Sequence, residues 1–240
     1  VSAVNSVGTG AASSTANATP NTYAMTDDFT GTTINTNKWT ESDAGGLGGT
    51  TGNVTQNGSL SITPTTASWA SQNGVYTTNT YDRTNGDVSM EFSVTRSSCG
   101  SGTGPVAAGY GDLNFTVSGS ASYIFLSNST GWEIYYWLNG SNQASSPQTL
   151  SGITSCTNGV PTTFRIVAKQ SGGVDIYANG AGSPNATIAG GTFTDKPFWF
   201  GGLNAAGTVT YDDVYIIEPA TGPYAPTGLG ATAGDGQASL

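Results

Sequence analysis

The sequence predicts an all-β protein, a sandwich of two antiparallel sheets with no significant helix. Short segments in which apolar and polar residues alternate recur along the 240 residues, and a period of two is typical of strands buried on one face. Gly, Asn and Ser separate these segments, as they do in tight turns. No segment shows convincing helical periodicity. Many short strands joined by short turns indicate two packed sheets.

The predicted body opens with Asp27–Trp39, DDFTGTTINTNKW, after a leader rich in Ser, Thr and Ala. Phe29, Ile34 and Trp39 are spaced apolar anchors, and the Gly and Asn residues between them supply turns. The natural partner of this opening is Thr208–Ile217, TVTYDDVYII, whose β-branched and aromatic residues predict a strand. We therefore expect the two ends of the body to meet.

Between these segments, Asp87–Thr95 is the cleanest strand, because every second residue from Val88 to Val94 is apolar. The other predicted strands are Ser59–Thr63, Tyr123–Ser127, Trp132–Leu138, Phe164–Gln170, Val174–Ala178 and Pro197–Phe200. The connections at 128–131 and 171–173 are short and rich in Gly and Ser, which predicts hairpins.

Composition excludes several classes of partner. Six basic residues stand against fifteen acidic ones, whereas phosphate binding needs clustered Lys and Arg, so nucleic acid is not expected. No apolar run approaches membrane-spanning length, so membrane insertion is not expected either. No signal peptide is recognisable, which suggests a mature or excised segment. A charged fraction of only 9%, with hydroxyls and amides in its place, indicates a secreted or cell-surface protein of bacterial type.

Cys99 and Cys156 are the only cysteines, and the chain contains no His. Two lone cysteines in loops rich in Gly, Ser and Thr favour a disulfide over a metal or catalytic site, with two free thiols as the alternative.

Both ends resemble parts of a fibronectin type III domain. Residues 1–20 contain V-x-A-V-N-x-x-G, a pattern similar to its last two strands, and residues 220–240 resemble its first strand and the start of its second. The resemblance implies that residues 1–20 and 220–240 are pieces of two such modules flanking a body at 21–219. Two ordinary linkers are the alternative.

Three motifs in the body resemble the concanavalin A-like lectin/glucanase and laminin-G-like domains. They are the opening DDFTG, the segment G-x-V-x-I-Y-x-N-G from Gly172 to Gly180, and the closing YDDVYI. The resemblance implies a jelly-roll sandwich for residues 21–219, and it does not specify a ligand.

Glucanases of this fold carry a Glu-x-Asp-x-x-Glu strand, and this chain departs from that pattern. Asp87 and Glu91 share a strand face but lie four residues apart, about 13 Å along a strand. Glu133 has no acidic neighbour two residues away on either side. Retaining hydrolysis needs two carboxyl groups about 5–5.5 Å apart. We therefore do not expect an enzyme, although a pair assembled across strands stays open.

A structural calcium ion is implied by the same resemblance, because many jelly rolls hold one where the first and last strands meet. Oxygen ligands suit calcium. The positions that match are Asp27, Asp28, Asp212 and Asp213. The alternative is that these acids cap turns or face water.

A sugar-binding surface needs exposed aromatic rings and hydrogen-bonding groups. Alternation on the predicted strands puts the candidates on presumed solvent faces, where they would line one concave sheet. The candidates are Glu133, Tyr135, Trp137, Asp175, Tyr177 and Trp199. The alternative is that these aromatic side chains belong to the core or cover a sheet.

These observations predict a non-catalytic carbohydrate-binding or adhesive module of a large secreted or cell-surface protein. Its partner would be a polysaccharide or surface glycan, with neighbouring copies of itself as a further partner. The alternative is a structural repeat of an extracellular stalk, filament or sheath. A glycoside hydrolase or lyase ranks third.

Overall fold

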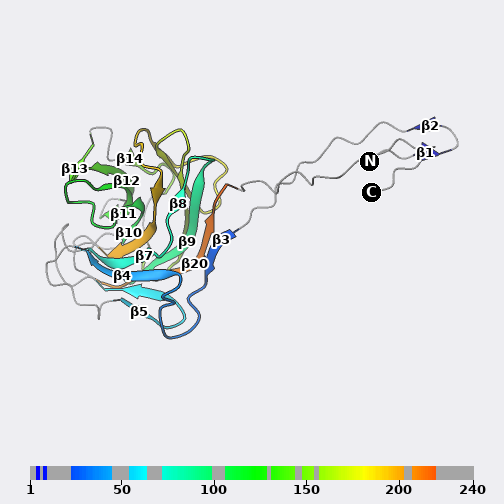
Figure 1. The fold of residues 1–240 in the computed structure, drawn as a ribbon. Helices are drawn as coiled ribbons and strands as arrows, with labels where there is room; N and C mark the ends of the chain where they lie inside the picture. Colours follow the sequence, from blue (N-terminus) through cyan, green and yellow to red (C-terminus); the bar gives the residue numbers. More distant parts are fainter. Residues whose placement is uncertain are drawn as a thin grey trace.

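A computed structural model describes ten ranges of the chain, with the remaining residues outside the description. These ranges are residues 4–5, 8–9, 23–44, 54–63, 72–98, 106–128, 131–143, 148–153, 157–202 and 207–219. The predicted fold class is confirmed: two large antiparallel sheets pack face to face, and the described residues contain no helix (Figure 1). Accordingly, no described segment is a helix long and apolar enough to cross a membrane.

The first large sheet, sheet I, has the strand order β13-β12-β11-β10-β19-β7-β4, with β14 paired to β12. Its strands are β4 (Trp39–Ala44), β7 (Gln72–Thr77), β10 (Val106–Gly111), β11 (Ala121–Asn128), β12 (Gly131–Leu138), β13 (Ser141–Asn142), β14 (Gln148–Thr149) and β19 (Phe198–Gly202). Strands β11 and β12 form the first of the two expected hairpins.

The second large sheet, sheet II, has the order β17-β16-β15-β9-β20-β6-β5, with β3 paired to β20. Its strands are β3 (Tyr23–Asp27), β5 (Val54–Gln56), β6 (Leu60–Ile62), β9 (Val88–Arg96), β15 (Thr162–Ala168), β16 (Val174–Ala178), β17 (Ala186–Ile188) and β20 (Val209–Ile217). The opening and closing segments meet as expected, because Asp27 on β3 pairs with Val214 on β20.

Aromatic side chains from both sheets fill the space between them. Phe92 on β9 contacts Phe164 in its own sheet and Phe125 and Phe200 in the other, with ring centroids 5.1–6.4 Å apart. Strict alternation of buried and half-buried residues along β9 follows from its period of two. Burial of this cluster is the main driving force for the fold.

One buried arginine links the sheets to their connecting loops. Arg83 is 1% exposed and follows β8 (Tyr81–Asp82), which pairs with β18 (Asp195–Lys196). Its guanidinium donates to the carbonyl oxygens of Gly173, at 3.3 Å, and Gly191, at 2.9 Å, and lies 5.0 Å from the ring centroid of Phe193. These contacts satisfy a charge that would otherwise be costly to bury.

Two sequence expectations fall largely outside the described residues. Cys99 and Cys156 both lie there, and so does the segment 220–240. In the segment 1–20, the structure describes β1 (Val4–Asn5) and β2 (Gly8–Thr9), which pair with each other in an antiparallel hairpin.

Candidate functional site

Six residues, one from each of six neighbouring strands, form a row across the outward face of sheet I. From β12 to β4 this central row contains Tyr135, Ile124, Gly109, Trp199, Tyr76 and Thr40. Directly opposed residues of antiparallel strands point to the same face. The adjacent residues on the same strands, such as Tyr123 and Phe200, point into the core between the sheets.

The middle of this face is covered by residues 112–120, which follow β10 and which we call the covering segment. Its apolar side chains and those of the sheet beneath form a second buried cluster of Leu113, Phe115, Ile124 and Trp199. The rings of Phe115 and Trp199 stack with centroids 6.1 Å apart. Sheet I therefore has apolar packing on both faces.

Trp199 is consequently not an exposed platform. It has no exposed surface, and its Nε1 donates to Ser122 Oγ at 3.2 Å. The expectation that Trp199 faces a ligand is wrong, because the covering segment folds back over the strand that carries it. Alternation correctly predicted that Trp199 points away from the core between the sheets. It could not predict that the covering segment packs on that face.

The covering segment is fixed at both ends. The Asp112 carboxylate accepts hydrogen bonds from Ala121 N and from Lys196 Nζ, each at 2.8 Å. At the other end, Asn139 N donates to the carbonyl oxygen of Ser120 at 2.8 Å. The partly exposed side chains of the sheet I face therefore lie on both sides of the covering segment, toward β12 and toward β4.

Glu133 and Tyr135 lie on β12, on one open side of the covering segment, and both are half-buried. The Tyr135 hydroxyl donates to Glu133 Oε2 at 2.6 Å. Burial raises the pKa of Tyr135, and the hydrogen bond to Glu133 and the negative charge of Glu133 raise that pKa further. Tyr135 therefore stays protonated at neutral pH and holds one oxygen of a carboxylate that faces outward.

Trp137 lies two residues further along the same face. Its ring centroid is 5.2 Å from that of Phe115, and its Nε1 is buried and has no hydrogen-bond partner among the described residues. Trp137 is thus partly enclosed by the covering segment. The expected sugar platform on β12 is therefore only half-exposed, since Tyr135 and Trp137 both pack against the cluster beneath the covering segment.

Asp175 and Tyr177 lie on β16 in sheet II, so the expectation that all six candidates line one sheet is wrong. Asp175 Oδ1 accepts hydrogen bonds from Lys169 Nζ at 2.9 Å and Thr187 Oγ1 at 2.6 Å. The Tyr177 ring lies 4.3 Å from the Arg165 guanidinium. Alternation predicts which way a side chain points from its strand, but not which sheet the strand joins.

Most other carboxylates are occupied by local hydrogen bonds. Asp82 Oδ2 accepts from Thr84 Oγ1, and Asp87 Oδ1 accepts from Gln170 N. Among the acidic side chains described by the structure, Glu133 alone lies in the open part of the sheet I face beside β12. The sequence offered no signal for this, because it depends on the covering segment and on strand order.

Of the expected calcium ligands, Asp27 does not fit that role. Its Oδ1 accepts from Phe29 N at 3.0 Å and its Oδ2 accepts from Trp39 Nε1 at 2.8 Å. Lys38 Nζ also lies 3.7 Å from Oδ2. Asp27 therefore serves to anchor the two apolar residues of the opening segment.

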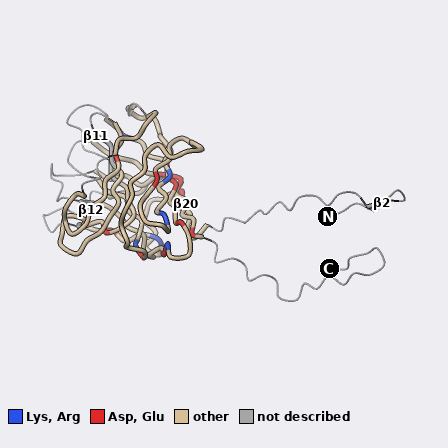
Figure 2. Tube along the Cα trace, turned by 90° about the horizontal axis from the view of Figure 1, so that it is seen from above, with Lys and Arg blue, Asp and Glu red and all other residues tan. Residues whose placement is uncertain are grey.

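A calcium site formed by the other three acids, Asp28, Asp212 and Asp213, stays a prediction. Burial raises the pKa of Asp212, and the negative charges of Asp213, Asp28 and Asp27 raise it as well, while a hydrogen bond from Asp213 N lowers it. Such mutual repulsion favours a cation nearby. No group of three or more potential metal-ligating side chains is found in the described ranges, so backbone carbonyls would have to complete the site. Acidic positions gather beside β20 in Figure 2.

No protein-family model and no curated protein matches this sequence. Solved structures do share the fold. One belongs to work on endo-acting O-glycanases by which human gut microbiota initiate mucin breakdown, with 11% identity, TM-score 0.60 and coverage of 82% of this chain and 100% of that one. The Bacillus licheniformis β-glucanase has 12% identity, TM-score 0.59 and coverage of 81% and 97%.

A third similar structure is an immunostimulatory antigen and pseudo β-1,3-glucanase of Mycobacterium tuberculosis, with 11% identity, TM-score 0.59 and coverage of 82% and 99%. These likenesses confirm the concanavalin A-like jelly roll. They also overturn the expectation of a non-catalytic binding or adhesive module or a structural repeat, because the proteins that share this fold are named mainly for cleaving glycans. At such low identity the likeness shows the fold of this chain, and the activity of the chain itself is a proposal.

Proposed function

We propose that this protein is a glycoside hydrolase that acts on β-glucan-type polysaccharides at the outward face of sheet I. The observation that carries the proposal is the Glu133–Tyr135 pair, a half-buried carboxylate held by a protonated hydroxyl on the open part of that face. The glucanase names of the structurally similar proteins support the substrate class.

In this proposal Glu133 gives a proton to the glycosidic oxygen as its bond to the anomeric carbon breaks, and then takes a proton from the water that adds to that carbon. Tyr135 is a positioning residue, because its hydroxyl fixes Glu133 Oε2 at 2.6 Å and leaves the second carboxylate oxygen for the substrate. Hydrolysis by two carboxyl groups needs a partner at about 5–5.5 Å or 6.5–9.5 Å. Among the described acidic side chains no such partner stands beside Glu133, so the proposal rests on Glu133 alone.

The test is release of reducing ends from β-1,3-glucan and mixed-linkage β-glucan. Glu133→Gln keeps the size and the acceptor for the Tyr135 hydroxyl but removes the titratable proton, so we expect at least about 100-fold lower kcat. Glu41→Gln, at an exposed position on β4 of the same sheet, is the matched control and should behave as the wild type. An unaltered rate in Glu133→Gln would exclude the proposed role.

Tyr135→Phe tests whether Tyr135 positions Glu133 or only stabilises the fold. Loss of the hydroxyl frees Glu133 Oε2 from its hydrogen bond, so kcat should fall while KM stays near the wild-type value. A merely structural role of Tyr135 would lower the melting temperature and leave kcat unchanged.

We further propose that residues 1–20 and 220–240 belong to fibronectin type III-like modules flanking the body, in a secreted or cell-surface protein. The tight antiparallel pairing of β1 with β2 is consistent with two consecutive strands of such a module. Limited proteolysis of the full chain should trim both ends and leave a resistant body close to 21–219. Resistant ends and a cleaved body would contradict this division.

A further inference from the structure

A second row of side chains crosses the outward face of sheet II, on the opposite side of the sandwich from Glu133. From β16 to β3 this outer row contains Tyr177, Arg165, Glu91, Tyr215 and Thr26. The residues that flank the row on its strands, such as Ile176, Phe92 and Ile216, are buried in the core. The row therefore points away from the core.

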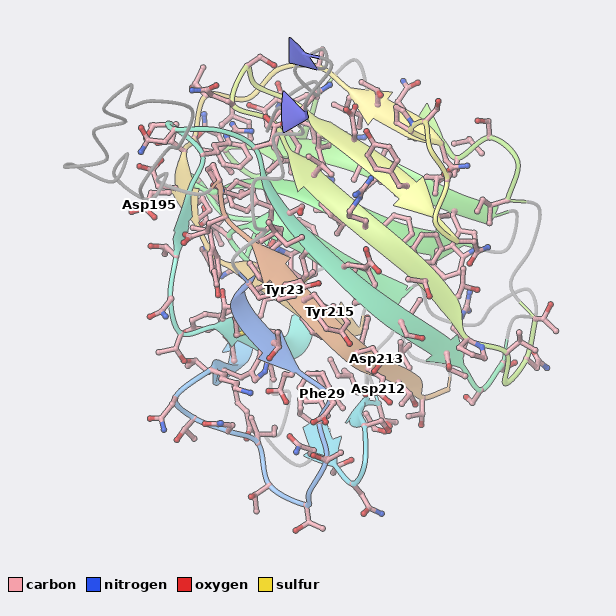
Figure 3. All side chains as sticks on the ribbon, turned by 90° about the vertical axis from the view of Figure 1, so that its right-hand side faces the viewer. Tyr23, Phe29, Asp195, Asp212, Asp213 and Tyr215 are labelled. Carbon is pink, nitrogen blue, oxygen red and sulfur yellow. The ribbon has the colours of Figure 1, made fainter. Side chains whose placement is uncertain are left out.

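One end of the outer row carries an exposed pair of aromatic rings. Tyr215 is 38% exposed and Tyr23 is 54% exposed, and their ring centroids lie 5.4 Å apart at an interplanar angle of 49°. Figure 3 shows the two rings side by side over β20. Contiguous exposed apolar surface can mark an interaction site, and these two adjacent rings are half of the four large exposed apolar or aromatic side chains in the described ranges.

The other end of the row carries two charged side chains that form no ion pair with a described residue. Arg165 stacks on Tyr177, with the guanidinium 4.3 Å from the ring centroid. Glu91 lies directly opposite Arg165 on the neighbouring strand, yet neither side chain forms an ion pair or hydrogen bond with any described residue. Both line a hollow of about 100 Å³. The stacked guanidinium keeps its edge donors free, and the carboxylate keeps its acceptors free.

We infer that the outer row is a second glycan-binding surface, which takes an extended neutral polysaccharide chain. Sugar hydroxyls both donate and accept, so a vicinal pair matches the donors of Arg165 together with the acceptors of Glu91. The Tyr23–Tyr215 pair offers ring faces on which a pyranose can stack. This surface goes beyond the proposed hydrolysis, because it needs neither Glu133 nor bond cleavage.

The length and charge of the row specify the ligand further. Three strand spacings separate Tyr177 from Tyr215, about 14 Å, which suits several linked sugar units rather than one. Glu91 and the net charge of −9 disfavour an acidic polysaccharide. The ligand class is therefore a neutral glycan, such as the β-glucan proposed as substrate.

The test is an NMR titration of protein labelled with ¹³C in its eleven tyrosine rings, in the Glu133→Gln background to prevent cleavage. The probe is a mixed-linkage β-glucan oligosaccharide, and single Tyr→Phe variants assign the signals. We expect Tyr23, Tyr215 and Tyr177 to shift together with one dissociation constant. An oligogalacturonate of the same length should leave them unshifted.

Variants then test the charged end. Arg165→Gln should weaken the binding that moves Tyr23 and Tyr215 by about tenfold, whereas Val160→Ala, which removes an exposed apolar side chain outside the row, should not. Unchanged signals of the buried Tyr110 and Tyr123 report that the variants are folded.

The possible outcomes separate the two proposals. Shifts confined to Tyr76 and Tyr135 would overturn the outer row and support the sheet I face. Shifts confined to the outer row would support that row and would show that the sheet I face does not bind this oligosaccharide. No shift at saturating oligosaccharide, or a response to oligogalacturonate instead, would overturn the outer row as a neutral-glycan surface.

Discussion

Gly109 leaves the space that the ring of Trp199 occupies. The two residues are direct partners on β10 and β19, and a Cβ atom at position 109 would lie 2.6 Å from both Cε2 and Cζ2 of that ring. The same Cβ would also meet the carbonyl oxygen of Tyr123. Absence of a side chain at position 109 is thus what allows the second apolar cluster to form on sheet I.

Gly109→Ala should therefore destabilise the protein by about 1–3 kcal/mol, the usual range for overpacking. Gly182→Ala is the matched control, because nothing lies within 4 Å of a Cβ there. Urea unfolding measures both. Equal stability of the two variants would show that the ring of Trp199 can move aside at no cost.

Gly109 and Trp199 also show which strands the sequence alone could predict and which it could not. Alternation predicted β9, β12, β16 and β20, because each strand has one face in a continuous core. It missed β10, VAAGYG, where small residues are dictated by a ring on another strand rather than by local propensity. The candidate site could be predicted only in part, because the sequence does not show which sheet a strand joins. Tyr135 and Tyr177 occupy similar positions in alternating patterns, yet their strands belong to different sheets.

Glu218 should make stability depend on pH. Burial raises its pKa, and the negative charges of Asp82 and Asp195 raise it further. A raised carboxyl pKa in the folded state contributes stability below the unfolded pKa, and this contribution is lost as pH rises through the folded value. Glu218→Gln should therefore melt at a higher temperature than the wild type at pH 7, with the difference vanishing below about pH 4. A difference that persists in acid would exclude this charge repulsion as its cause.

A Cys99–Cys156 disulfide stays a prediction, and one hydrogen bond joins the two described segments next to the cysteines in sequence. Gly159 N donates to the carbonyl oxygen of Arg96 at 2.8 Å, and each cysteine lies three residues from this hydrogen bond along the chain. Unreduced, unfolded protein should contain essentially no free thiol, and reduction should lower the free energy of unfolding by about 4 kcal/mol. Two titratable thiols per chain would rule the bridge out.

Calcium is predicted to bind beside β20 through Asp28, Asp212, Asp213 and backbone carbonyls. An ion that binds only the folded state stabilises it, by about 2.7 kcal/mol at a concentration one hundred times its Kd. A chelator should lower Tm, added calcium should restore it, and Asp212→Asn should abolish the response while Asp82→Asn keeps it. The same Tm with and without chelator would show that no stabilising calcium ion binds beside β20.

Digestion of β-1,3-glucan and mixed-linkage β-glucan in H₂¹⁸O decides whether glycosidic bonds are hydrolysed at Glu133. Hydrolysis places one oxygen from water at each new reducing end, whereas a lyase leaves an unsaturated sugar and takes up none. The wild-type protein should release oligosaccharides that carry one ¹⁸O, and Glu133→Gln should release none. Intact glucan after prolonged incubation with the wild type, or unsaturated products without ¹⁸O, would contradict hydrolysis at Glu133.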